Sequence, residues 1–284
     1  MPDGSVVLVE IAAGRITRVG SDGHKTVVAE PGGGPNGLAM GPDGKLYCCN
    51  NGGFAWREAF GYLVPHGQAD DYGGGRIERI DIATGHVETL YSEAANAPLR
   101  APNDIVFDAH GGFWFSDHGK TRARERDVTG IFYARADGSR LDEVIFPSEN
   151  PNGIGLSPDG TRLYVAETYT CRLMAFDVIA PGQVAAGGGA GGPGIPLYRP
   201  AGYTFFDSLG VEADGNICVA TIGECGISVV SPAGELVEFV ATDDVFTTNI
   251  CWGGVDGMDA YITCSGSGRL VKTRWKRPGL KLAY

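Results

Sequence analysis

The sequence predicts an all-β fold, a six-bladed β-propeller, from three observations. A unit with the pattern of a β-hairpin recurs along the chain. Glycine is abundant, with 45 of 284 residues, so many backbone positions are expected to need tight turns. No amphipathic stretch of useful helical length occurs, which favours many short strands over long helices.

The hairpin unit is clearest at residues 152–167. It consists of Asn-Gly, a short apolar run, a Pro-Asp-Gly turn, a second apolar run and one polar residue, a pattern typical of a β-hairpin. Its turn residue recurs at six places: Asp3, Asp43, His110, Asp159, Asp214 and Asp256. Units of four strands every roughly 40–50 residues are typical of propeller blades. We therefore expect six four-stranded antiparallel blades in one domain over residues 1–284, with the first blade incomplete at the N-terminus.

The expected strands follow the chain in order. Residues 5–19 predict two strands about a turn at Gly14, and residues 24–30 predict a third. The later hairpins fall at 36–50, 103–118, 152–167, 207–221 and 249–263, with further strands at 76–81, 87–91, 130–134, 143–146 and 172–177. Residues 52–75 are expected to form a long loop rich in aromatic side chains, and residues 181–195 a flexible low-complexity insertion.

Composition limits the classes of partner. The formal net charge is −11 and no basic cluster occurs, so we expect neither nucleic acid nor an anionic membrane as a partner. No apolar run approaches the roughly 20 residues of a membrane span, and the first residues lack the pattern of a signal peptide. The seven cysteines show no CxxC spacing, which favours small core residues in a reducing cytoplasm. A monomer or weak oligomer with a small-molecule ligand is the expectation.

Each turn residue also gives a reference position within the repeat. The residue seven positions before it is polar in five copies: Asn36, Asn103, Asn152, Asp207 and Asn249. The first strand of a propeller blade runs along the central channel, so we expect these side chains to ring one end of the axis. Their oxygens suit a hard divalent cation, with Asp207 as the anionic ligand. Asn and Asp are also common turn residues, and this plainer interpretation stays open.

These motifs resemble the regucalcin/gluconolactonase family of six-bladed propellers. The resemblance covers nearly the whole chain outside 52–75 and 181–195, and it is carried by Arg100-Ala-Pro-Asn103-Asp, Pro-Asn152-Gly, Asp207-Ser-Leu-Gly-Val, Trp-Phe-Ser-Asp117 and Gly266-Ser-Gly-Arg-Leu-Val. It implies a metal-dependent lactonase whose cation is held by Glu, Asn and Asp ligands.

The family's functional residues are carried over position by position. The resemblance places the Asn ligand at Asn152 and the Asp ligand at Asp207, and Asn103 at a contact with substrate or water. Ala101 stands where the family has a substrate-binding Arg, and Arg100 lies one residue away. The cation is expected to be Ca²⁺, with Mg²⁺, Mn²⁺ or Zn²⁺ as alternatives. The family's Glu ligand, in a Glu-Gly-Pro motif, would lie five residues before Met1, so we expect the natural protein to begin further upstream.

The expected reaction is hydrolysis of a lactone, a sugar-acid lactone of the gluconolactone type. The cation would polarise the lactone carbonyl and activate a water, with Asp207 as ligand and base. Residues at the ends of the second strands, Asn50, Asp117 and His118, are expected to line the same end as the ring and to bind substrate together with Asn36, Asn103 and Asn249. Two alternatives remain: a metal-dependent esterase or phosphotriesterase, and a non-catalytic propeller that binds a metal or ligand.

Overall fold

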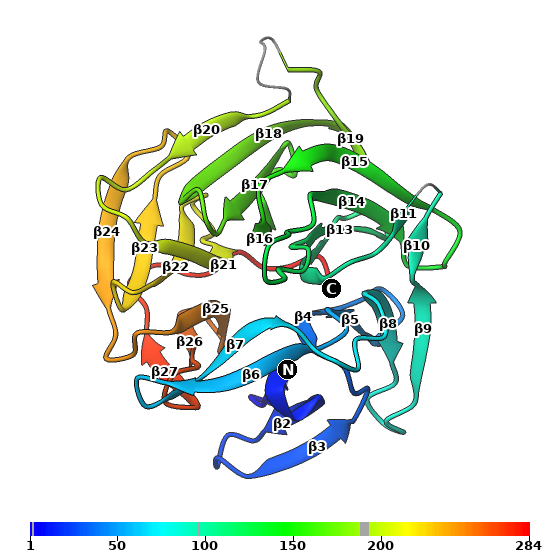
Figure 1. The fold of residues 1–284 in the computed structure, drawn as a ribbon. Coiled ribbons are helices and arrows are strands. Elements are labelled where there is room, and N and C mark those ends of the chain that lie inside the picture. Colours follow the sequence, from blue (N-terminus) through cyan, green and yellow to red (C-terminus); the bar gives the residue numbers. More distant parts are fainter. Residues whose placement is uncertain (2, 96, 188–192) are drawn as a thin grey trace. The chain divides into compact units, whose positions relative to one another are not determined.

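The computed structural model describes residues 1, 3–95, 97–187 and 193–284. These residues form β-strands connected by turns, with one short 3-10 turn at Ile11–Ala13 and no α-helix in the described ranges. Contacts divide the chain into two compact units, residues 1–107, 111–146 and 284 (unit 1), and residues 108–110 and 147–283 (unit 2). The predicted all-β class is confirmed, and six antiparallel sheets follow one another along the chain (Figure 1).

Unit 1 contains the first three blades. The first is the three-stranded sheet β1 (Val6–Glu10), β2 (Arg15–Val19) and β3 (Lys25–Ala29). The second pairs β4 (Pro35–Met40), β5 (Leu46–Asn50), β8 (Arg76–Ile80) and β9 (Val87–Tyr91). The third pairs β12 (Pro102–Phe107), β13 (Gly112–Asp117), β14 (Thr129–Arg135) and β15 (Leu141–Ser148), and a short pair, β10 (Glu93–Ala94) and β11 (Ala97–Pro98), precedes it.

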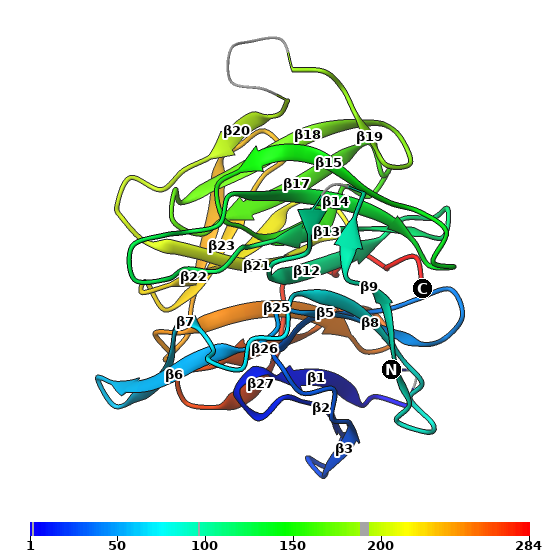
Figure 2. The ribbon, with the colours of Figure 1, turned by 45° about the vertical axis from the view of Figure 1, so that its right-hand side comes forward.

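Unit 2 contains the other three blades. The fourth is built on β16 (Pro151–Leu156), β17 (Arg162–Glu167) and β18 (Arg172–Ala180), and both β19 (Gln183–Val184) and β20 (Ile195–Tyr198) pair with β18. The fifth pairs β21 (Phe205–Val211), β22 (Ile217–Ile222), β23 (Gly226–Val230) and β24 (Leu236–Ala241). The sixth pairs β25 (Thr247–Gly253), β26 (Asp259–Cys264) and β27 (Arg269–Arg274), the orange to red sheet in Figure 2.

The repeated Asp-Gly turn has a local physical cause. The turn carboxylate accepts a hydrogen bond from the backbone N–H two residues later, as in Asp43 to Lys45 at 3.2 Å and Asp159 to Thr161 at 3.0 Å. The glycine between them has a positive φ, +73° at Gly44, which glycine adopts without steric cost. The same bond forms at Asp214 and Asp256, whereas at His110 the carboxylate of Asp108 accepts the N–H of His110.

Each unit has its own apolar core between neighbouring blades. In unit 1 the first, second and third blades pack through buried aliphatic and aromatic side chains, with the Tyr47 and Phe107 rings edge to face at 5.0 Å. In unit 2 the fourth to sixth blades pack in the same way, around Phe206 and Trp275. The seven cysteines are free thiols, five of them buried, and no helix among the described residues is long and apolar enough to cross a membrane.

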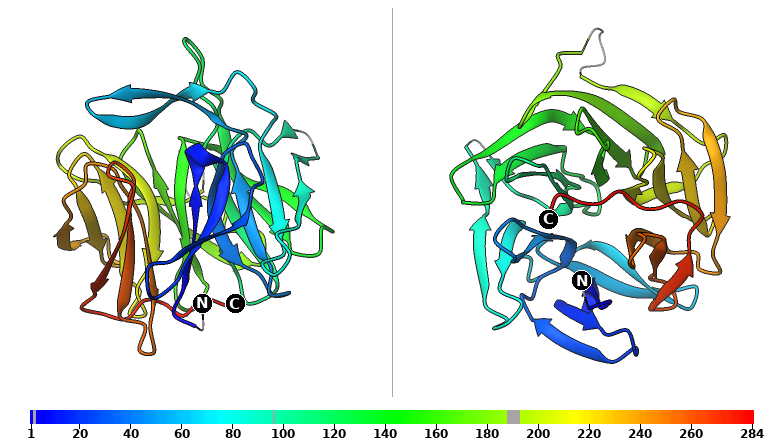
Figure 3. Two further views of the ribbon diagram at one scale, coloured as in Figure 1. Left: turned by 90° about the horizontal axis from the view of Figure 1, so that it is seen from below. Right: turned by 180° about the vertical axis from the view of Figure 1, so that it is seen from behind.

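Three features differ from the sequence predictions. Residues 52–75 contain a hairpin, β6 (Phe54–Ala59) and β7 (Tyr62–Gln68), at the end of unit 1 opposite to the N-terminus (Figure 3). Residues 183–184 and 195–198 join the sheet of β18, so the predicted flexible insertion is wrong at its two ends, while residues 188–192 lie outside the described residues. The sixth blade has three described strands, because the chain leaves the sheet after Arg274 and pairs with β21 through Leu280.

Candidate functional site

All five residues of the predicted ring lie in first strands and not in turns. Four of them fall at a break in the pairing of the first strand with the second, where the first strand carries one extra residue: Asn36 (β4), Asn103 (β12), Asn152 (β16) and Asp207 (β21). In β25 the extra residue is Thr248, and Asn249 beside it pairs with Thr263. Such β-bulges re-aim side chains and occur next to active sites. The interpretation of these residues as turn formers is therefore wrong, and the shared register has a structural origin.

The glycine after the asparagine brings neighbouring first strands together. A Cβ on Gly153 would lie 2.7 Å from the carbonyl oxygen of Asp207, and one on Gly37 would lie 2.4 Å from that of Asn103. Neither glycine has a positive φ, so the close backbone approach accounts for them. Neighbouring first strands therefore approach closely in both units: β16 lies against β21 in unit 2, and β4 lies against β12 in unit 1.

Unit 2 contains both predicted metal ligands. Asn152 is buried and donates from Nδ2 to Thr168 Oγ1 at 3.0 Å, which fixes the plane of its amide. Asp207 is half-buried on the adjacent strand. Asn249 lies on the next strand, and its Oδ1 accepts the N–H of Ile250 at 2.7 Å. One acceptor position of this oxygen is therefore used by the backbone of β25.

Unit 1 contains the predicted substrate contacts. Asn103 is 6% exposed, and its Oδ1 is a buried acceptor without a hydrogen-bond partner in the described structure. Asn36 is half-buried, and Arg100 is exposed. A buried amide oxygen without a partner is costly unless a ligand or water satisfies it. Asn103 therefore fits a contact with a ligand, whereas Arg100 is accessible but not held by a side-chain bond among those described.

The second-strand residues hold the chain that leads into the first strands. Asn50 accepts the N–H of Gly34 at 2.9 Å, and Asp117 accepts those of Arg100 and Ala101, both at 2.7 Å. Burial raises the pKa of Asp117 above its usual value, although three backbone N–H groups oppose the shift. These bonds favour a positioning role over direct substrate contact. The half-buried His118 donates its backbone N–H to Ala101 at 2.9 Å.

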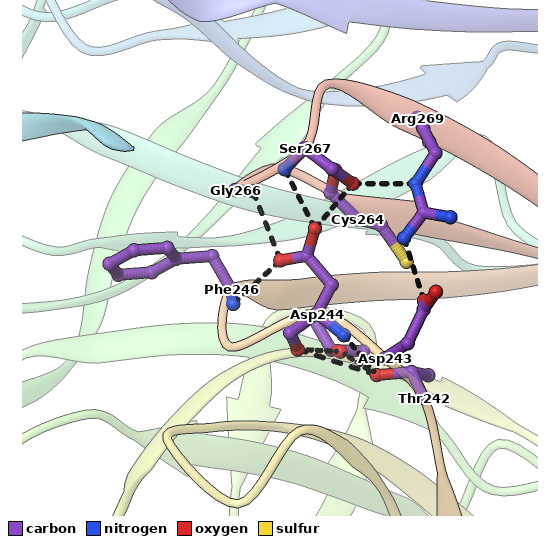
Figure 4. A network of polar contacts seen from close by, with 9 residues as sticks. Thr242, Asp243, Asp244, Phe246, Cys264, Gly266, Ser267 and Arg269 are labelled. Atoms are coloured by element: carbon purple, nitrogen blue, oxygen red, sulfur yellow. Dashed lines mark hydrogen bonds and ion pairs between the residues drawn. The ribbon is translucent and has the colours of Figure 1, made fainter. Parts of the chain in front are cut away.

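Unit 2 repeats this arrangement with other carboxylates. Glu167 accepts the N–H of Glu149 at 3.3 Å before β16. In the sixth blade the carboxylate lies before the first strand and not at the end of the second. Asp244 precedes β25 and accepts the N–H groups of Phe246, Gly266 and Ser267 (Figure 4). A buried carboxylate or amide thus ties the start of the first strand to the end of the second in several blades.

Lys120 is the functional candidate that the sequence did not reveal. It is fully buried in unit 1, where Nζ donates to Gly53 O at 2.7 Å and to Asn51 Oδ1 at 3.1 Å, and lies 4.0 Å from the centre of the Phe54 ring. Burial lowers the pKa of its amine to about 7. A single lysine after His-Gly in a polar stretch has the pattern of an exposed residue, so sequence carried no signal for it.

The donor chemistry fits a hard divalent cation. The described residues contain no cluster of three or more His, Cys, Asp or Glu side chains that could hold a metal ion. Asn152 and Asp207 instead offer an amide and a carboxylate from adjacent strands, and such oxygens suit Ca²⁺ or Mg²⁺. The ring residues remain predictions as ligands.

Known proteins resemble this chain over most of its length. A family model, the SMP-30/Gluconolactonase/LRE-like region, matches residues 1–266. The chain is 25% identical to a gluconolactonase of Zymomonas mobilis, covering 86% of this chain and 64% of that protein. It is 29% identical to the lactonase drp35 of Staphylococcus haemolyticus, covering 82% of this chain and 64% of that protein. The chain thus spans less than two thirds of the length of both relatives.

Solved structures share the fold. A gluconolactonase of Xanthomonas campestris superposes with a TM-score of 0.73 at 20% identity, covering 93% of this chain and 80% of the other. Regucalcin of Agrobacterium tumefaciens, described as a calcium-binding protein, superposes with a TM-score of 0.70 at 20% identity, covering 99% of this chain and 91% of the other.

Proposed function

The chain belongs to the SMP-30/gluconolactonase/LRE-like family, and from this membership we propose that it is a lactonase that uses one divalent cation. The relatives named gluconolactonase and lactonase support a cyclic ester as substrate, and a sugar-acid lactone of the gluconolactone type is the proposed one. The calcium-binding neighbour supports Ca²⁺ as the cation.

One observation carries the assignment of the metal ligands. Asn152 and Asp207 occupy the same bulge position on two first strands, and Gly153 lets the backbones of these strands meet beside Asp207. An amide and a carboxylate are thereby presented from neighbouring strands of unit 2. This pairing is the feature expected of ligands to a hard cation.

The roles of the residues follow from their chemistry. When bound, a divalent cation polarises a carbonyl oxygen and lowers the pKa of water. Asp207 supplies the negative charge of the site and is the proposed proton acceptor, while the neutral Asn152 adds an oxygen without reducing the cation's charge. The buried Oδ1 of Asn103 is an acceptor suited to a sugar hydroxyl or a water.

The remaining predicted residues take two kinds of role in the proposal. Asn36, Asn249, His118 and Arg100 are proposed to contact substrate. Asn50 and Asp117, whose oxygens accept backbone N–H groups, are proposed to position the segments before Asn36 and Asn103.

Asp207→Ala tests the proposal, with Asp214→Ala as the matched control because Asp214 is an exposed turn aspartate of the same blade. Calorimetric titration with Ca²⁺ and hydrolysis of a panel of sugar and aromatic lactones are measured on the wild type and both variants. We expect the Asp207 variant to lose both Ca²⁺ binding and hydrolysis, and the Asp214 variant to retain both.

Three other results would each refute part of the proposal. Near-normal turnover by the Asp207 variant would refute its role. Hydrolysis of aryl esters or phosphotriesters without hydrolysis of lactones would assign the esterase alternative. Ca²⁺ binding without hydrolysis of any of these substrates would assign a binding scaffold.

A further inference from the structure

The hairpin β6–β7 is attached to a segment of the third blade through Lys120. Lys120 Nζ donates to Gly53 O and Asn51 Oδ1, directly before the hairpin, and faces the ring of Phe54, its first residue. At the other end, Arg122 Nη1 donates to Gln68 Oε1 at 3.2 Å, the last residue of β7. Both ends of the hairpin are therefore held by residues 120–122.

The chain that follows the hairpin is attached to the predicted substrate segment. Tyr72 donates its hydroxyl to the carbonyl oxygen of Arg100 at 2.5 Å. A Cβ on Gly75 would lie 2.5 Å from Pro102 Cδ and 2.7 Å from the Arg100 carbonyl carbon, so the two backbones are in close contact. The insertion thus lies against residues 100–102, directly before Asn103.

A four-residue stretch links these two attachments. Asp117, at its start, holds the backbone N–H groups of Arg100 and Ala101, and Lys120, at its end, holds the base of the hairpin. We infer that Lys120 is a positioning residue for substrate binding, which seats the aromatic hairpin beside the segment that leads to Asn103. The inference rests on the proposed lactonase function for its effect on catalysis but not for its effect on the hairpin.

Burial of the Lys120 amine is costly, so the amine is expected only where specific hydrogen bonds satisfy it. Lys120 is fully buried, and the charges that act on it are those of Asp117 and Asp127, which favour the ammonium form. Burial outweighs them and lowers the pKa to about 7. Either protonation state retains at least two N–H donors, enough for Gly53 O and Asn51 Oδ1. An apolar side chain of equal length would fill the space and leave these acceptors without this donor.

Hydrogen exchange measured by mass spectrometry tests the seating without reference to activity. Lys120→Met removes the donors at similar length, and Lys25→Met is the control because Lys25 is an exposed residue of β3 in the same unit. We expect amides of residues 54–68 to exchange about 10- to 100-fold faster in the Lys120 variant, the range for losing hydrogen bonds to such a group, and to be unchanged in the control. Wild-type exchange rates in the Lys120 variant would overturn the inference.

The dependence on pH separates this role from simple space filling. Seating the hairpin over Lys120 releases a proton, so protection of residues 54–68, corrected for intrinsic exchange, should rise between about pH 7 and 9 in the wild type. The Lys120→Met variant should show no such rise. A rise of equal size in both proteins would refute the assignment.

Kinetics on the same variants test the link to substrate. We expect Lys120→Met to raise KM about tenfold with kcat nearly unchanged, because the change removes alignment of the binding segment and leaves Asp207 intact. A fall in kcat at unchanged KM would overturn the positioning role. If neither wild type nor variant hydrolyses lactones, the lactonase proposal fails, whereas the exchange experiment still decides the role of Lys120.

Discussion

Alanine in place of Gly153 should force apart the two strands that carry Asn152 and Asp207. The new Cβ would lie 2.5 Å from the backbone N of Leu209 and 2.7 Å from the carbonyl oxygen of Asp207. Ordinary van der Waals contact begins near 3.4 Å, so the strands must separate by about 0.9 Å. Every atom in the way belongs to the backbone, so no side chain can rotate to make room.

The size of the effect follows from this displacement. Overpacking of a well-packed interior costs typically 1–3 kcal/mol, and a clash with backbone should lie near about 3 kcal/mol. With about 2.1 cal/mol/K of unfolding entropy per residue, a chain of 284 residues should lose about 5 °C in Tm. A misplacement of about 1 Å between catalytic groups reduces turnover by about 100-fold.

The matched control lies two residues along the same strand. A Cβ on Gly155 would meet Leu209 Cδ1 at 2.7 Å and Val211 Cγ2 at 3.1 Å, the ends of side chains that can rotate. Gly155→Ala should therefore cost about 1 kcal/mol and leave Ca²⁺ binding intact. Calorimetric Tm and Ca²⁺ titration are the assays. A Gly153→Ala variant with the Tm and Ca²⁺ affinity of the wild type would refute the close packing of β16 on β21.

Three further outcomes are expected. Ca²⁺ at about 100 times its Kd should stabilise the wild type by about 2.7 kcal/mol and leave the Tm of Asp207→Ala unchanged; equal shifts would contradict the ligand assignment. Asp244→Ala should lower the free energy of unfolding by about 3 kcal/mol, because three partly buried backbone N–H groups lose their acceptor, and denaturant titration should show little change for the exposed Asp243→Ala. Because the folded-state pKa of Lys120 is about 7 against an ordinary 10.5, the unfolded state binds more protons above pH 7, so stability should rise between pH 7 and 9 and Lys120→Met should lack that contribution.

The blades were predictable because their local signals agree with the final structure. At Asp43 and Asp159 the turn chemistry is complete within three residues, so the sequence shows it directly. The hairpin β6–β7 was missed because Pro65 and Gly67 interrupt the strand pattern of β7. Its two-residue turn also places Phe60, with φ +54° and 98% exposed, where Asn or Gly is usual.

The positions of the proposed ligands could be predicted from the register of the repeat, but the hydrogen bonds and burial around them could not. The seven-residue offset located Asn152 and Asp207, since β16 and β21 carry the bulge at the same distance from their turns. The hydrogen bonds of Asp117 depend on how the preceding segment folds back, which no local pattern encodes. The burial of Lys120 results from residues 51–54, nearly 70 positions away, and long-range packing of this kind leaves no periodic signal.

The bulge in five successive blades has a consequence for how such a protein changes over time. A residue in the bulge has no direct partner in the ladder, so its side chain can be exchanged without disturbing cross-strand packing. Under the proposed function, one substitution per blade would alter what the molecule binds while the turns and cores that fold each blade stay the same. The positions proposed to contact ligand are thereby separate from the positions that keep the protein folded.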